Sequence, residues 1–239
     1  MENSAVVNQT GPLCPVGSAL RVPPLGYRMV KRAFDLTAAL ILSVLLAVPA
    51  AILMLLIRLD SPGPAIFRQE RLGKNGKPFM ILKLRSMRLD AEKNGPRWAE
   101  RNDSRCTRLG SFLRRSRLDE LPQLWNVLKG DMSFVGPRPV VLTEQTLLDL
   151  RAQWEADRVR PGITGLAQIK GRDELPIYRK ALYDRYYARH LSFRLDWRIL
   201  RYTVRYVLKR EGIREGSSRA VRVAHRRPVR HKATRTRNR

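Results

Sequence analysis

The chain has 239 residues, enough for one catalytic domain with an appended element. Its 47 Lys and Arg outnumber 21 Asp and Glu, and the net charge of +26 favours a polyanion, an anionic membrane or phosphate-bearing substrates as partners. Cys14 and Cys106 lie far apart with no third cysteine, which excludes a disulfide framework or cysteine zinc site and fits a reducing cytosol.

After a predicted flexible segment, residues 1–27, the strongest apolar signal runs from Leu36 to Ile57 without a charged residue. At about 1.5 Å per residue this run can reach across a hydrocarbon layer of roughly 30 Å. Basic residues flank both ends, and positive charge tends to stay on the cytoplasmic side, so both ends are predicted to be cytoplasmic. These residues are Arg28, Lys31 and Arg32 before the run, and Arg58, Arg68 and Arg71 after it.

Pro49 lies in the middle of this run, where its missing N–H and its ring disrupt the preceding helical turn. We therefore predict that residues 28–60 form a re-entrant membrane helix that bends at Pro49 and returns to the side it entered. An ordinary spanning helix stays open, because such helices often tolerate proline. A secretory signal cleaved after Ala50 fits less well, because the uncharged run continues to Ile57.

Residues 61–64 combine serine, proline and glycine and predict that the helix stops there. The segments Ala65–Leu72 and Pro78–Leu84 contain β-branched and aromatic residues, and the loop between them contains Asn75-Gly76. Asn-Gly is a strong turn signal, so this part is predicted to be a β-hairpin.

From Arg108 to Val127, apolar residues recur at roughly helical spacing, but Pro122 interrupts the pattern. The simplest solution places Pro122 in the first turn of a new helix, with Asp119 just ahead of it. Asp119 and Glu120 would then lie at a helix start, where the helix dipole favours negative charge.

Asp184–Leu208 is a second amphipathic region, with arginines between its apolar positions. It is either a packed surface helix or a basic helix lying along lipid headgroups. Residues 213–239 form a predicted disordered basic tail, because Ser217–Arg239 holds nine Lys or Arg and no acid. Residues 61–212 would be the catalytic domain.

Adjacent carboxylates such as Asp119-Glu120 are common on surface helices, but this pair lies in a basic setting that includes Arg114, Arg115, Arg117 and Arg138. A carboxylate can attack phosphorus to give an acyl phosphate if cations offset the phosphate charge. A second carboxylate can hold Mg²⁺, which prefers oxygen ligands and keeps water and substrate phosphate in its shell. The pattern therefore favours phosphoryl transfer.

Five blocks carry a resemblance to a known family: KRAFDL, the apolar segment with its central proline, SPGPAIFRQERLGKNGKPFMILKLRSM, LDELPQLWNVLKGDMSFVGPRP and RPGITGLAQIKGR. In this order, from about Lys31 to Gly212, the chain resembles the bacterial sugar transferases. These are monotopic phosphoglycosyl transferases, also called undecaprenyl-phosphate glycosylphosphotransferases.

The resemblance implies transfer of a sugar 1-phosphate from a UDP-sugar to a polyprenyl (undecaprenyl) phosphate, with release of UMP, at the start of exopolysaccharide, O-antigen, capsule or glycoprotein glycan assembly. Asp119 would be the covalent nucleophile, and Glu120 its partner and Mg²⁺ ligand. The donor phosphates and nucleotide would be bound by Lys83, Arg114, Arg138 and Arg172, with Thr164 and Gln168 either lining the pocket or making local hydrogen bonds.

The resemblance also implies a predominantly α fold with a small β-hairpin, on the cytoplasmic face of the bacterial inner membrane. The chain departs from many relatives at Val48, Leu166 and Lys170, which bears on the helix bend and on sugar preference. A membrane-tethered polyanion or nucleic-acid binding protein is the alternative function, although the chain has no groove-binding or base-stacking motif. The basic tail would contact anionic lipid headgroups.

Overall fold

The computed structural model describes residues 23–91, 103–171 and 175–209. The predicted basic tail, Arg172 and residues 1–22 lie outside these ranges. The helices are α1 (Leu25–Leu45), α2 (Ala47–Asp60), α3 (Arg108–Ser116), α4 (Gln123–Lys129), α5 (Gln145–Gln153), α6 (Leu166–Lys170), α7 (Ile177–Arg189) and α8 (Phe193–Lys209). The strands are β1 (Ile66–Leu72), β2 (Pro78–Leu84), β3 (Ser133–Val135) and β4 (Gly162–Thr164), and short 3₁₀ turns cover Lys74–Gly76, Leu118–Glu120 and Ala156–Arg158.

The predicted apolar segment is a bent pair of helices, α1 and α2, which meet at 60°. The break lies at Leu46, and Pro49 occupies the first turn of α2. A proline removes the N–H that would bond the carbonyl four residues earlier, so the disruption falls ahead of the ring rather than at it. Across the described ranges, neither helix is by itself long and apolar enough to span a membrane, whereas the bent pair passes on length and composition.

The KRAFDL segment docks α1 onto the rest of the protein. Arg32 donates from Nη1 to the Val127 carbonyl (2.7 Å) and from Nη2 to the Leu128 carbonyl (3.0 Å), at the C-terminal end of α4. The buried Asp35 accepts a hydrogen bond from the backbone N–H of Phe134 on β3 (3.2 Å). These side chains therefore bind specific internal partners, in addition to the flanking role that their charge predicted.

The start of α1 is also joined to α8. The Asp196 carboxylate accepts hydrogen bonds from Tyr27 (2.8 Å) and Lys31 (2.9 Å) through Oδ2. Its Oδ1 lies 2.7 Å from the hydroxyl of Tyr187, on α7. Two rings, Tyr27 and Phe193, pack at 4.9 Å between centroids. One buried carboxylate thus fixes the crossing of three helices.

The predicted hairpin is confirmed, with β1 and β2 paired antiparallel. Asn75 (φ 57°) and Gly76 (φ 69°) both adopt left-handed backbone conformations, as the predicted Asn-Gly turn requires. One core packs β2 against α1 and α4 through Phe79, Ile81, Ala39, Leu124, Val127 and Met132. A second core joins α2, β2 and α3 through Ile57, Ala65, Leu84 and Leu113.

Two features differ from the predictions. A short parallel pair, β3–β4, joins the SFVGPRP and RPGITG blocks, and three-residue strands are too short to leave a periodic pattern. The predicted amphipathic region Asp184–Leu208 is divided between α7 and α8, because the chain turns at residues 190–192. The predominantly helical fold with a small hairpin is otherwise as expected.

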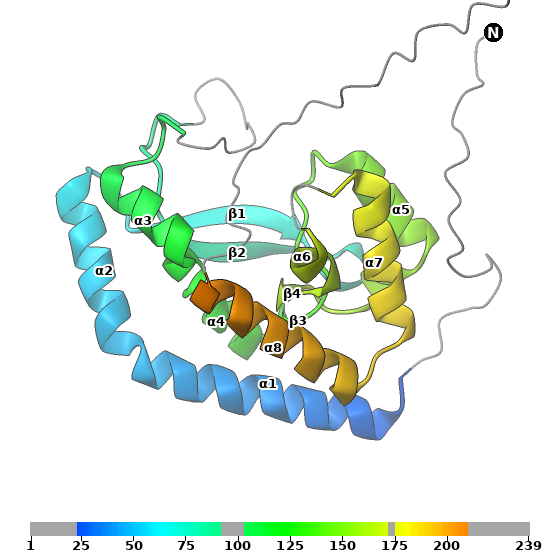
Figure 1. Ribbon diagram of the computed structural model, residues 1–239. Coiled ribbons are helices and arrows are strands. Elements are labelled where there is room, and N and C mark those ends of the chain that lie inside the picture. The colour runs from blue at the N-terminus through cyan, green and yellow to red at the C-terminus, as the bar shows by residue number, and fades with distance from the viewer. Residues whose placement is uncertain (1–22, 92–102, 172–174, 210–239) are drawn as a thin grey trace, which may run out of the picture.

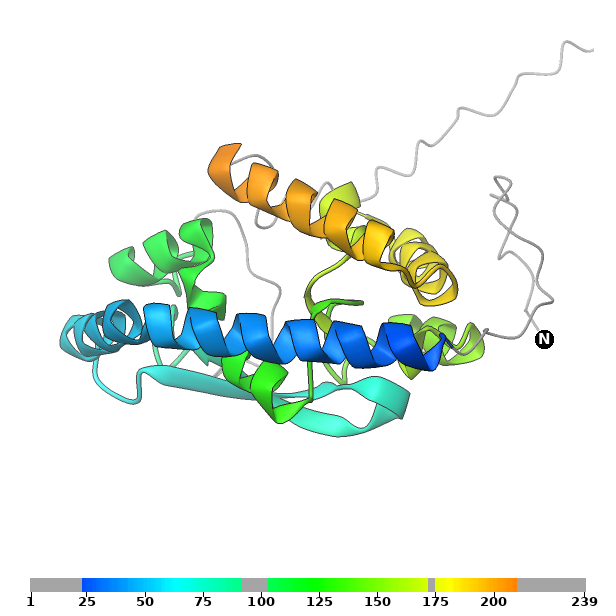
Figure 2. The same ribbon diagram turned by 90° about the horizontal axis from the view of Figure 1, so that it is seen from below.

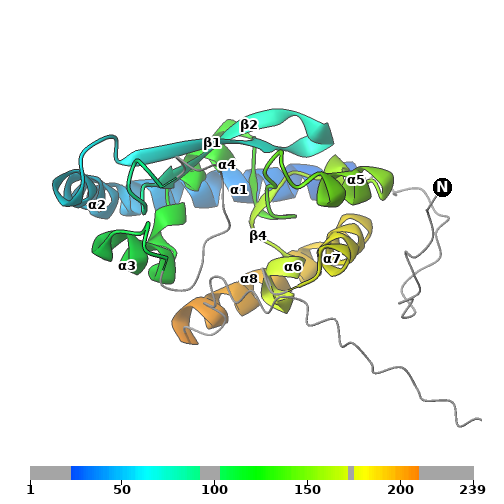
Figure 3. The ribbon, with the colours of Figure 1, turned by 90° about the horizontal axis from the view of Figure 1, so that it is seen from above.

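The arrangement is layered (Figure 1). In views from below and from above, the β1–β2 hairpin lies on one side of α1, and α6, α7 and α8 lie on the other (Figures 2 and 3). The ends of α1 and α8 that meet at Asp196 lie together, and the two helices diverge from there (Figure 2).

Candidate active site

The backbone around Asp119 and Glu120 forms a tight connection between α3 and α4. Arg117 ends α3 in a left-handed conformation (φ 59°), and Leu118–Glu120 make a 3₁₀ turn. Pro122 is the N-cap of α4, close to the predicted position. Because the connection is so short, both carboxylates are held on a rigid turn, and both are buried, with exposed fractions of 9% for Asp119 and 8% for Glu120.

Asn126 connects this turn to the hairpin. Its Nδ2 donates to the Met80 carbonyl (2.7 Å), and its Oδ1 accepts from the Leu82 N–H (3.1 Å), so the amide acts as a backbone partner for β2. The buried Asn126 thereby locks α4 onto the strand that carries Lys83. As a result, Lys83 is close enough to Asp119 and Glu120 for their charges to act on its ammonium group.

Asp119 has the electrostatic character of a poised carboxylate. Burial, reinforced by the negative charge of Glu120, raises its pKa from 3.8 to about 6, while Lys83, Arg114 and Arg138 pull that pKa downward. Burial and Glu120 thus disfavour the ionised form of Asp119, and the surrounding cations partly stabilise it. At neutral pH it remains mostly ionised, and an ionised carboxylate is the form that can attack phosphorus.

Lys83 is perturbed in the opposite direction. Burial, together with repulsion from Arg138, lowers its pKa to about 8, and the neighbouring carboxylates only partly offset this. The family resemblance had implied that Lys83 binds the donor phosphates. Its position among Asp119, Glu120 and Arg138 places it inside the site.

Arg138 contacts Glu120 directly. Its Nη1 lies 3.2 Å from Glu120 Oε1, and the Arg138 side chain keeps 32% of its surface exposed. Arg114 acts on Asp119 through its charge, and its Nη1 donates to Cys106 Sγ at 3.3 Å. Among the described residues, the structure therefore brings together Asp119, Glu120, Lys83, Arg114 and Arg138, which the sequence had separated by up to 55 positions.

Gln168 makes a local hydrogen bond, whereas Thr164 bonds a residue of α8 that lies 39 positions later in the chain. The Thr164 hydroxyl is 2.6 Å from that of Thr203, and Gln168 Nε2 donates to the Ile163 carbonyl at 2.9 Å. Gln168 Oε1 is buried and has no hydrogen-bond partner within the described part of the chain.

Several residues that organise the site were missed on sequence. Asn126 gave no signal, because an amide within a helical pattern resembles any surface residue. Arg71 had been counted among flanking charges, yet it bonds Gln69 and the Pro139 carbonyl. Arg151 and Asp184 form a buried ion pair at 2.6 Å. Their spacing in sequence carried no pattern, since the two belong to different helices.

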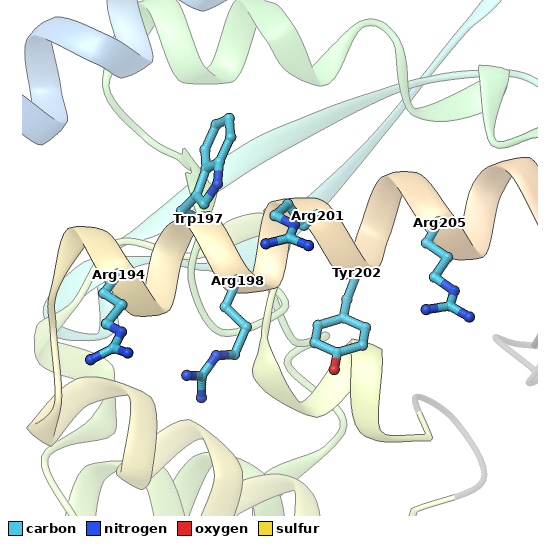
Figure 4. Close-up of a pocket in the computed structure, with 6 residues that line it drawn as sticks. All are labelled: Arg194, Trp197, Arg198, Arg201, Tyr202 and Arg205. Carbon is cyan, nitrogen blue, oxygen red and sulfur yellow. The ribbon is translucent and has the colours of Figure 1, made fainter.

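The outward face of α8 is a separate basic surface. Four arginines recur there at helical spacing, and Figure 4 shows Arg194, Arg198 and Arg205 projecting to one side with Tyr202, while Trp197 points to the other. A hollow of about 440 Å³ is lined by Arg194, Trp197, Arg198, Arg201, Tyr202 and Arg205. Neither Asp119 nor Glu120 lines this hollow.

Across the described ranges, no three His, Cys, Asp or Glu side chains cluster in a way that would hold a metal ion. Asp119 and Glu120 supply two adjacent buried carboxylates, and their mutual repulsion is one cause of the raised pKa of Asp119. This donor set fits a cation such as Mg²⁺ that takes its remaining ligands from water and substrate phosphates.

Comparison with known proteins points to the same chemistry. The profile described as "Bacterial sugar transferase" matches residues 26–210. The chain is 40% identical over 214 residues to the UDP-N-acetylgalactosamine-undecaprenyl-phosphate N-acetylgalactosaminephosphotransferase of Aeromonas hydrophila, covering 87% of this chain and 48% of that protein. It is 42% identical over 184 residues to the UDP-glucose:undecaprenyl-phosphate glucose-1-phosphate transferase of Escherichia coli K12, covering 74% of this chain and 40% of that protein.

A third relative is similar in length. The exopolysaccharide production protein PSS of Rhizobium leguminosarum bv. phaseoli is 41% identical over 190 residues, covering 74% of this chain and 94% of that protein. The chain thus spans about half or less of the two larger relatives. Since the family profile runs from the start of α1 to the end of α8 and includes the buried carboxylate pair, this chain belongs to the bacterial sugar transferase family.

Proposed function

We propose that this protein is a phosphoglycosyl transferase that moves a sugar 1-phosphate from a UDP-sugar to a polyprenyl phosphate. The observation that carries the proposal is the buried Asp119 carboxylate, with a pKa of about 6, among Lys83, Arg114 and Arg138. The names of the Aeromonas and Escherichia relatives, which specify UDP-sugars and undecaprenyl phosphate, support the same substrate classes.

In the first step, a carboxylate oxygen of Asp119 attacks the phosphorus that bears the sugar. The new bond joins that oxygen to phosphorus, and the bond from this phosphorus to the oxygen bridging toward UMP breaks. UMP leaves with the bridging oxygen and its electron pair. Arg138 and Arg114 offset the charge on the equatorial oxygens, and Lys83 contributes a further cation where the charge accumulates.

In the second step, a phosphate oxygen of the polyprenyl phosphate attacks the same phosphorus. The Asp119–phosphorus bond breaks, and Asp119 returns as a free carboxylate. The product is a polyprenyl diphosphate sugar. Neither step requires net proton transfer when the incoming phosphate is a dianion. This economy suits a site in which the nucleophile is already ionised at neutral pH.

Glu120 would hold Mg²⁺, with substrate phosphates and water as further ligands. When bound, the ion supplies Lewis-acid polarisation of the phosphate oxygens. The role of Glu120 within the chain is to orient Arg138 through the 3.2 Å contact. Because the proposed reaction needs this polarisation, removing Mg²⁺ with a chelator should abolish transfer while leaving the fold intact. Full turnover in the presence of chelator would show that Mg²⁺ is not part of the mechanism.

The decisive experiment separates the two steps. The protein is incubated with a panel of UDP-sugars and no acceptor, and UMP release is followed together with intact mass. The expected result is a burst of UMP and a sugar-phosphate adduct on the peptide containing Asp119. Asp119→Asn should give neither. Product formation with polyprenyl phosphate in the absence of any adduct would refute the covalent mechanism while leaving the substrate class standing.

A membrane location on the cytoplasmic face follows from the same chemistry, because one substrate is soluble and the other is a lipid phosphate. Large apolar side chains are exposed along the bent pair, for example Val44 and Val48, each with 69% of its surface accessible. An exposed apolar surface of this kind suits burial in lipid. The arginine-rich outward face of α8 would contact anionic headgroups, with Trp197 and Tyr202 at the interface.

A further inference from the structure

The backbone of the Pro137-Arg138-Pro139 turn has few hydrogen-bond donors. Two of its three residues lack a backbone N–H, so the turn can be fixed chiefly through its carbonyl oxygens. In the structure, four consecutive carbonyls accept hydrogen bonds. The donors are Gly162 N to Pro137 O (2.9 Å), Arg151 Nη1 to Arg138 O (2.9 Å), Arg71 Nη1 to Pro139 O (3.3 Å) and Leu72 N to Val140 O (3.3 Å).

Arg151, on α5, is itself rigidly held. Its Nε and Nη2 donate to Asp184 Oδ2 at 2.9 Å and 2.6 Å, which leaves Nη1 for the Arg138 carbonyl. Arg151 and Asp184 are both buried. A guanidinium has a planar fork that can serve both partners, whereas a lysine ammonium placed against Asp184 would lose this fixed geometry.

Arg71 approaches the same turn from the hairpin. Its Nε and Nη2 donate to Gln69 Oε1 at 3.1 Å and 2.6 Å, and its Nη1 reaches the Pro139 carbonyl. The turn is therefore held by guanidinium groups from two separate units of the fold, α5 and β1. Both groups bind backbone oxygens and leave the Arg138 side chain to face Glu120.

We propose that Arg151, anchored by Asp184, and Arg71 are positioning residues that fix Arg138 for binding the transferred phosphate. The inference rests on the proposed function. The physical reason is preorganisation: a phosphate-binding guanidinium stabilises the transition state fully only if it is already in place. Arg138 is partly exposed, so without fixed carbonyls its backbone could rotate and its guanidinium could leave Glu120.

The test uses Arg151→Lys, which keeps a positive charge beside Asp184, and Arg158→Lys as the matched control. Arg158 pairs with Glu155 at the protein surface, and its side chain is 58% exposed. Single-turnover UMP release should fall on the order of ten- to a hundredfold in Arg151→Lys. It should stay within about twofold of wild type in Arg158→Lys.

A double-mutant cycle distinguishes the proposed positioning role of Arg151 from a purely structural role. In an Arg138→Ala background, the added Arg151→Lys change should lower the UMP-release rate less than about twofold, because the residue it positions is gone. The same proportional loss in both backgrounds would overturn the proposal.

Hydrogen exchange gives a readout that is independent of activity. Arg151→Lys should speed exchange of the amides of Gly136, Arg138 and Val140 while leaving α1 and α4 unchanged. A uniform increase throughout the protein would indicate general destabilisation and refute a positioning role. If Arg151→Lys does not fold, Arg71→Met carries the same cycle from the hairpin side. Absence of UMP release from wild type with every donor would refute the proposed function. The exchange experiment would still decide whether Arg151 fixes the Pro137-Arg138-Pro139 turn.

Discussion

In the proposed mechanism, Asp119 must be ionised to react, and this charge has a cost in folding stability. Its pKa is raised from 3.8 to about 6, so folding favours the protonated form. The associated stability is complete below about pH 4 and is lost as the pH rises through about 6. At neutral pH the protein thus keeps a buried, ionised carboxylate beside Glu120. A neutral side chain at position 119 would avoid this loss of stability. Such a conflict between stability and activity is typical of a reacting group.

Asp119→Asn should therefore be inactive and more stable than wild type. At pH 7.5 the free energy of unfolding should rise by on the order of 2 kcal/mol, and the difference should vanish near pH 4. Chemical denaturation in detergent at the two pH values measures this. Equal stability of the two proteins at pH 7.5 would show that the surrounding cations already offset the cost of the charge.

Lys83 should set the alkaline limit of activity. Because its pKa is lowered to about 8, it loses its charge as the pH rises through that value, and with it one phosphate-binding cation. Together with the acid limb near pH 6 from Asp119, this predicts a bell-shaped profile for single-turnover UMP release. Omitting the acceptor keeps the ionisation of polyprenyl phosphate out of the measurement.

A substitution that keeps the positive charge tests whether Lys83 causes the alkaline limb. In Lys83→Arg the guanidinium stays charged, so the alkaline limb should move above pH 9 even if the maximal rate falls. Lys129→Arg, at an exposed lysine paired with Asp131, should leave both limbs in place. An unshifted alkaline limb in Lys83→Arg would assign that limb to another group.

At the scale of elements, α1 is both the first half of the apolar pair and a part of the catalytic scaffold. Arg32 bonds the carbonyls at the end of α4, whose first turn follows Asp119 and Glu120, and Asp35 bonds the N–H of Phe134 on β3, which leads into the Arg138 turn. The two chain segments that carry Arg138 and the carboxylates proposed to be catalytic are thus both attached to one helix. The position of α1 is thereby linked to the geometry of the site.

Arg32→Gln should weaken this attachment. Two charge-assisted hydrogen bonds are lost at a helix end, so we expect a loss of stability of about 1–3 kcal/mol and a slower single-turnover rate. Arg28→Gln is the matched control, since Arg28 is an exposed residue one turn earlier on the same helix. Thermal unfolding and UMP release are compared for both. Identical behaviour of the two variants would mean that Arg32 contributes only its charge.

At the scale of the molecule, we propose that the bent pair determines how the protein contacts a membrane. The 60° bend at Leu46, Pro49 in the next turn, and basic residues at both ends favour a segment that returns to its side of entry. The docking of α1 onto α4 and α8 fixes one arm of this pair to the catalytic domain. This attachment would set the height of the active site relative to the lipid phosphate.

Paired cysteine labelling tests the topology. In a background with Cys14 and Cys106 changed to Ser, Gly26→Cys and Pro64→Cys place single thiols at exposed positions in the first turn of α1 and after α2. A membrane-impermeant maleimide should label both from the cytoplasmic side of oriented vesicles. Labelling of the two positions from opposite sides would establish a spanning segment and refute re-entrance.

The sequence by itself determined the elements whose signals are local. Asn75-Gly76 specified the hairpin turn, Pro122 specified the start of α4, and the uncharged run from Leu36 to Ile57 specified the bent pair. The family motifs likewise singled out Asp119, Glu120 and Arg138 before their surroundings were known. The turn, proline and apolar-run signals depend on backbone geometry or hydrophobicity within one continuous segment of the chain. Such constraints can be recognised from the sequence alone.

Only the tertiary structure decided what holds the site together. The contacts of Asn126 with β2, of Arg151 with the Arg138 carbonyl, and of Asp196 with Tyr27 and Lys31 are each made by one polar side chain. Their partners lie between 13 and 169 residues away in the sequence. The shift of the break from Pro49 to Leu46 and the division of Asp184–Leu208 into two helices were settled at the same level. The physical reason is that a buried polar group is specified by the partner that satisfies it, and that partner is chosen by the fold.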